Sequence, residues 1–83
     1  MNLKVVFWDY KELQDPEAIQ RFFEKSSESG QRWVLHRFLE HGRVVDTFAF
    51  FHPSIIKLQL HKLRLRPYTL KKWERILDIY GER

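Results

Sequence analysis

The sequence predicts a two-layer α+β domain, with two helices packed on a mostly antiparallel sheet in the order β-α-β-β-β-α over residues 1–83. Three observations predict this fold. Runs rich in β-branched and aromatic residues flank the dipeptide His41-Gly42. Apolar and polar residues alternate after Pro53. Two other segments carry signals of a helix start. A chain of this length forms one domain.

The first two elements follow from composition and capping. The segment 3–10, LKVVFWDY, is β-branched and aromatic and is interpreted as a strand. Asp15-Pro16 predicts a helix start, because Asp caps free N–H groups and Pro is tolerated in the first turn. The apolar side of that helix would carry Ile19, Phe22 and Phe23, and Gly30 would end it.

Residues 32–51 predict a β-hairpin that turns at His41-Gly42, where glycine supplies a positive φ. Opposite charges support this register across the strands, in the pairs Glu40 with Arg43 and Arg37 with Asp46.

The next segment, 54–66, alternates as a strand if a bulge near His61-Lys62 corrects its phase. A helix remains the alternative, although it would divide the apolar residues between two opposite sides. Pro67 then ends the strand, and Thr69 caps a final helix that Gly81 closes. The apolar residues at helical spacing in it are Leu70, Trp73, Ile76, Leu77 and Tyr80.

Charge and composition narrow the function. The net charge is +4, and it is unevenly distributed: residues 1–30 hold four basic and six acidic residues, whereas 31–83 hold eleven and five. A one-sided basic region is typical of a phosphate-binding surface. The chain has no cysteine and no apolar run of membrane-spanning length, so we expect no disulfide, no membrane association and a cytoplasmic location. Its abundant Lys, Arg and Glu resemble a thermophile's composition.

The predicted sheet would place aromatic rings beside cations on one face. Bases stack on such rings while Lys and Arg neutralise phosphates. The sequence therefore predicts a non-catalytic nucleic-acid-binding protein that prefers RNA or single strands. The candidate residues on the sheet are Trp33, Arg37, Phe48, Phe50, Lys57, His61, Arg64 and Arg66, and those on the last helix are Lys71, Lys72 and Arg75.

Two alternatives stay open. The rings of Trp33, Phe48 and Phe50 could be core, or they could form the interface of a homodimer in a protein-interaction or inhibitory adaptor module. The basic start of the last helix could also be a solvated face held by local pairs, Lys71 with Glu74 and Arg75 with Asp78.

The octapeptide DTFAFFHP, residues 46–53, is similar to the third-strand motif of the RNA recognition motif family. Phe48, Ala49 and Phe50 match its central triplet, whose aromatic residues stack bases in that family. Asp46 and Thr47 stand where the motif has a basic residue and glycine, so the family is not assigned.

The sequence shows no motif for a cofactor or a metal. The four histidines, His36, His41, His52 and His61, lack the spacing of a zinc site. There is no cysteine nucleophile and no glycine-rich phosphate loop. We therefore expect no enzymatic activity, with one alternative kept: Asp9, Asp46 and His61 could meet at a sheet edge as a metal-dependent nuclease cluster.

Overall fold

A computed structural model describes residues 1–80, and within this range all regular structure is helical, with no strand. The predicted α+β fold is therefore wrong. The segment 3–10 forms a short helix and a turn instead of a strand. The elements are α1 (Leu3–Val6), η1 (Lys11–Leu13, 3-10), α2 (Pro16–Lys25), α3 (Glu28–His41), α4 (Val44–Phe50), α5 (Pro53–Gln59), η2 (Leu60–Lys62, 3-10) and α6 (Pro67–Tyr80).

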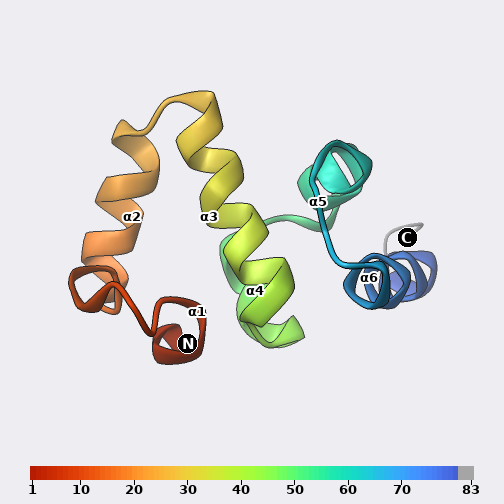
Figure 1. Cartoon of the computed structure of the whole chain (residues 1–83), viewed down its shortest axis with the longest axis horizontal. Helices are drawn as coiled ribbons and strands as arrows, with labels where there is room; N and C mark the ends of the chain where they lie inside the picture. The colour runs from red at the N-terminus through yellow and green to blue at the C-terminus, as the bar shows by residue number, and fades with distance from the viewer. Residues whose placement is uncertain (81–83) are drawn as a thin grey trace.

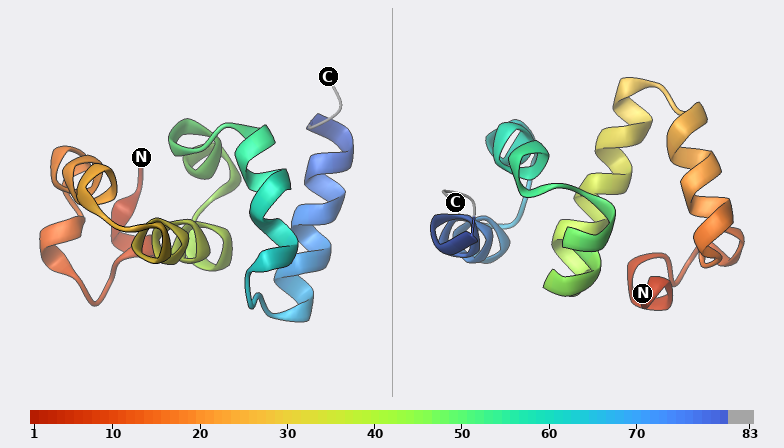
Figure 2. Two further views of the ribbon diagram at one scale, coloured as in Figure 1. Left: turned by 90° about the horizontal axis from the view of Figure 1, so that it is seen from above. Right: turned by 180° about the vertical axis from the view of Figure 1, so that it is seen from behind.

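Helix α3 is the centre of the molecule. In Figure 1, α1 and α2 lie on one side of α3, and α5 and α6 lie on the other. Helix α4 packs behind the C-terminal part of α3. Contacts join α3 to α1, α2, α4 and α6. Figure 2 shows α5 and α6 side by side at one end of the molecule, far from α2 at the other.

The predicted hairpin over 32–51 is wrong because its apolar residues have a helical period. Alternation in a strand would place Val34 and Phe38 on one face and Leu35 on the other. In α3, successive residues turn by about 100°, so all of these side chains face the neighbouring helices together. Each is at most 2% exposed, as is Leu39.

Gly42 does not form a hairpin turn. Its φ of −82° and ψ of 158° are extended backbone, and it ends α3 before α4 begins. Glycine is needed for close approach: an added Cβ would lie 2.8 Å from the Phe38 carbonyl oxygen and 3.2 Å from Val6 Cγ2. Because glycine has no side chain, the backbone between α3 and α4 can pass close to Phe38 in α3 and to Val6 in α1.

The predicted bulged strand over 54–66 is also wrong, since this segment forms α5, η2 and a short connection. Its apolar residues do divide into two groups. Ile56 and Leu60 are buried, at 0% and 2% exposed. Ile55 and Leu58 remain 46% and 63% exposed. A helix in this segment leaves Ile55 and Leu58 exposed, and the structure tolerates that exposure.

The start predicted for α2 is confirmed. The Asp15 carboxylate accepts a hydrogen bond of 3.0 Å from the Ala18 N–H, and Pro16 occupies the first turn. The predicted end is wrong, because α2 stops at Lys25 and Gly30 lies inside α3.

The predicted final helix is confirmed as α6, although it begins at Pro67 and Thr69 lies within it. Trp73 is fully buried, and its indole N–H donates a hydrogen bond of 2.9 Å to the Leu39 carbonyl oxygen. This bond joins α6 to α3. Gly81, the predicted terminator, lies outside the described residues. Within residues 1–80, no helix has the length and hydropathy that crossing a bilayer requires.

Candidate nucleic-acid interface

The three aromatic residues of the predicted sheet face pack against the helical core. Trp33 lies 5.7 Å from the Phe7 ring between centroids. Phe48 lies 5.8 Å from Trp73, and Phe50 lies 5.0 Å from Phe38 in a stacked arrangement. All three are partly buried. Because the sheet is absent from the described chain, these rings do not form the predicted platform.

Arg37 is a structural residue whose side chain is only 12% exposed. Its Nε donates a hydrogen bond of 2.9 Å to the Val6 carbonyl oxygen, and its guanidinium pairs with the Asp9 carboxylate. The guanidinium carbon also lies 4.3 Å from the centroid of the Trp8 ring. The predicted pair of Arg37 with Asp46 is therefore wrong. The hydrogen bond from Arg37 holds the pKa of Asp9 below its ordinary value of 3.8.

Arg66 is engaged by Glu40, whose side chain is 4% exposed. The Glu40 carboxylate accepts hydrogen bonds from the Arg66 main-chain N–H (2.8 Å), from Arg66 Nε (2.9 Å) and from the Thr69 hydroxyl (2.7 Å). These bonds attach the first turn of α6 to α3. The predicted pair of Glu40 with Arg43 is wrong.

Burial alone would raise the pKa of Glu40, but the hydrogen bonds from Thr69 and Arg66 outweigh it and hold the pKa below 4.5. The unfolded chain therefore takes up this proton more readily than the folded protein. The resulting stabilisation is complete above the unfolded pKa and is lost as the pH falls through the folded one.

We expect Glu40→Gln to lower the free energy of unfolding by about 1–2 kcal/mol at neutral pH, because one charged acceptor of three donors is lost. The deficit should shrink as the pH falls below the unfolded value of 4.5, and it should vanish once the native carboxylate is protonated as well. Urea unfolding of both proteins across this pH range measures the effect. Two parallel stability curves would contradict the assignment.

The residues of the hypothetical nuclease cluster lie in separate contacts. The Asp46 carboxylate accepts hydrogen bonds from the Asn2 N–H (3.0 Å) and from Arg43 (3.1 Å). Both lower the pKa of Asp46, and the bond from Asn2 has the larger effect. Asp9 is bound by Arg37, and His61 Nε2 lies 2.8 Å from a Glu74 oxygen. Over residues 1–80, no three acidic, histidine or cysteine side chains form a group suited to a metal.

Lys57 and His61 line a groove between α5 and α6. Leu60 and Leu77 contribute its apolar part, and Glu74 and Asp78 its acidic part, around a volume of about 360 Å³. The charges in this groove are therefore mixed. Arg64 lies in the exposed connection before α6.

The remaining predicted cations lie together on the outer side of α6. Lys71, Lys72 and Arg75 line a hollow of about 530 Å³ with Tyr68, Ile76 and Ile79. We call these six residues the basic flank. Among residues 1–80 its three cations make no ion pair, so the predicted local pairs with Glu74 and Asp78 are absent.

Three members of the basic flank, Tyr68, Ile76 and Ile79, were not predicted as site residues, and the aromatic one is Tyr68. It is 79% exposed and lies in the first turn of α6. The signal was available: Lys71, Lys72 and Arg75 follow Tyr68 by three, four and seven residues, which is the spacing of one helix face.

The chain was compared with protein families, curated proteins and solved structures, and no similar protein was found. No family model matches the chain, and neither the curated proteins nor the solved structures contain a match.

Proposed function

We propose that this protein binds nucleic acid without catalysis and that the basic flank of α6 contacts the phosphates. One observation carries the proposal: Lys71, Lys72 and Arg75 line the same hollow, and among residues 1–80 no carboxylate lines it with them. Lys and Arg side chains at such positions release counterions when they neutralise phosphates, which drives binding to any nucleic acid.

The distribution of charge around α6 supports this function. Glu74 and Asp78 line the groove toward α5 and not the hollow of the basic flank. Glu74 is already engaged there by His61. Within residues 1–80, the cations of the basic flank make no ion pair with these acidic side chains and are therefore available to an anionic ligand.

The test is the salt dependence of binding to a short fluorescent oligonucleotide, followed by anisotropy. Three phosphate contacts with a single strand predict a slope of about −2 for log K against log salt concentration. This slope corresponds to a roughly 20-fold loss of affinity between about 50 and 200 mM salt. Replacing Lys71, Lys72 and Arg75 together by Gln should abolish most of the slope.

A charge-matched control separates the site from net charge. Lys11, Arg21 and Lys25 are exposed cations in η1 and α2, at the opposite end of the molecule. Their replacement by Gln also removes three positive charges, and we expect the slope to be retained. Equal losses in both triple variants, or no binding at low salt, would contradict the proposed function.

The alternative function, a protein-interaction or homodimer module, was expected to use the rings of Trp33, Phe48 and Phe50. These rings pack on the core, so the basic flank is the better supported surface. The absence of cysteine supports a cytoplasmic location for the proposed binding.

A further inference from the structure

We propose that the basic flank selects unpaired nucleotides, because Tyr68 stacks on an exposed base while the cations hold the adjacent phosphates. This inference rests on the proposed function and specifies the ligand as single-stranded nucleic acid.

The Tyr68 ring is isolated from the other rings of the described chain. Tyr68 has the largest exposed fraction among the exposed large apolar and aromatic residues. The other two tyrosines contact rings of the protein, Tyr10 at 5.3 Å from Trp33 and Tyr80 at 6.0 Å from Phe48, between centroids. Within residues 1–80, Tyr68 makes no such ring contact and no side-chain hydrogen bond. Its faces are therefore open to a ligand.

The residues of the basic flank are spaced along α6 in one direction from Tyr68. At a rise of 1.5 Å per residue, Lys71, Lys72 and Arg75 lie about 4.5, 6 and 10.5 Å beyond Tyr68 along the helix axis. The ring is at one end of the flank and the cations continue from it in one direction. A strand lying along this flank can place one base on the ring and its following phosphates beside the cations.

The basic flank suits a single strand better than a duplex. Bases in a duplex are already stacked, and a side chain that inserts between them must unstack a step, which costs a few kcal/mol. A helix in a groove would also present both of its flanks to phosphate backbones. The groove on the α5 side of α6 carries Glu74 and Asp78 beside Lys57 and His61, so it offers a second backbone a mixed surface and not a basic one. The one-sided flank favours one strand.

The test compares two ligands of equal length and charge, a uridine oligomer and an abasic ribose-phosphate oligomer. Because both carry the same phosphates, any difference in their affinities reports base contacts. Stacking of one base corresponds to roughly 5- to 150-fold tighter binding of the uridine oligomer. We expect Tyr68→Leu to abolish this preference, and Tyr68→Phe to retain it because the ring remains.

The matched control is Tyr80→Leu, which removes an exposed tyrosine outside the basic flank and should leave the preference unchanged. Circular dichroism of each variant checks that the helices are intact. The triple Gln variant of the cations should bind both oligomers weakly.

Each outcome decides between the two proposals. Equal affinity of the native protein for both oligomers would overturn base stacking while leaving phosphate binding in place. Competition by a duplex as effective as that by a single strand would overturn the preference for unpaired nucleotides. Binding of neither oligomer at low salt would overturn the proposed function as well.

Discussion

Replacing Trp73 with Ala should lower the free energy of unfolding by about 3–5 kcal/mol, the usual cost of truncating a large buried aromatic side chain. Trp73 is fully buried, lies against Phe48, and donates its indole N–H to the Leu39 carbonyl oxygen. The variant loses the packing and leaves a buried carbonyl without this donor. The total free energy of unfolding of a domain of this size is about 5–10 kcal/mol, so much of its stability depends on Trp73.

Urea unfolding followed by circular dichroism measures this change. Trp73→Phe should be intermediate, because a ring remains while the hydrogen bond to Leu39 is lost. Leu58→Ala provides the control: Leu58 is 63% exposed, and we expect a change within about 0.5 kcal/mol. A Trp73→Ala variant as stable as the control would contradict the placement of α6 against α3.

Replacing Arg37 with Met should lower the free energy of unfolding by about 2–3 kcal/mol, because charged hydrogen bonds are lost while the aliphatic stem is kept. The guanidinium of Arg37 joins the Val6 carbonyl oxygen and the Asp9 carboxylate to α3, and it lies over the Trp8 ring. Without it, α1 and the turn after it lose their main polar attachment.

A second measurement tests the mechanism. Because the hydrogen bond from Arg37 lowers the pKa of Asp9, the pKa in the Arg37→Met variant should rise toward 3.8, as followed by NMR titration. Arg21→Met, an exposed substitution in α2, is the control and should change neither quantity. An unchanged Asp9 pKa together with unchanged stability would show that the Arg37 contacts do not hold the N-terminal segment.

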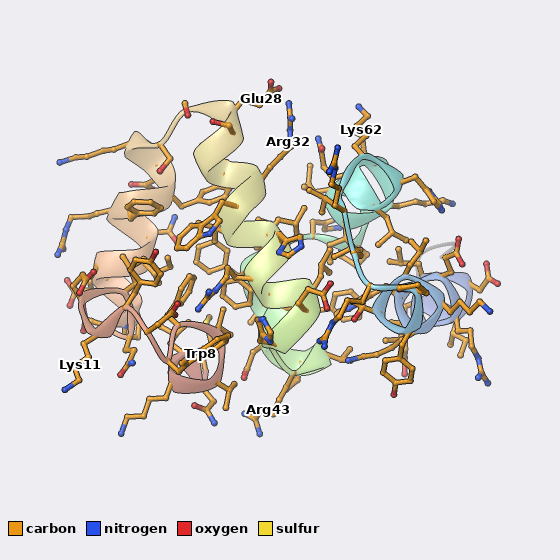
Figure 3. The ribbon with its side chains drawn as sticks, viewed as in Figure 1. Trp8, Lys11, Glu28, Arg32, Arg43 and Lys62 are labelled. Carbon is orange, nitrogen blue, oxygen red and sulfur yellow. The ribbon has the colours of Figure 1, made fainter. Side chains whose placement is uncertain are left out.

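Some charged side chains of the protein join helices, whereas others make no ion pair within residues 1–80. Glu40 and Arg37 fasten the segments on either side of α3, at α6 and α1 respectively. Figure 3 shows a more exposed pair, Glu28 with Arg32, at the far end of α3, where the two side chains meet at 2.7 Å. Such an exposed pair contributes little to stability. The cations of the basic flank make no ion pair within residues 1–80, and this distinguishes them from Arg37 and Arg66.

The sequence by itself determined the features that depend on neighbours within one or two turns. Asp15 and Pro16 start α2 through contacts with the next three residues, so the sequence pattern was sufficient. The period of Trp73 and Leu77 identified α6 as a helix and its buried side. The excess of cations in the C-terminal half was likewise visible in the sequence.

Only the tertiary structure decided the segments between those helices. β-branched and aromatic residues in 32–51 favour strands locally, but Val34, Leu35 and Phe38 bury together only as a helix surrounded by α1, α2, α4 and α6. The same contacts decided which cations are engaged and which are available, since Arg66 meets Glu40 from another helix whereas Lys71 meets no acidic side chain within residues 1–80. In these segments burial and ion pairing depend on residues far away in the sequence, so local spacing could not decide them.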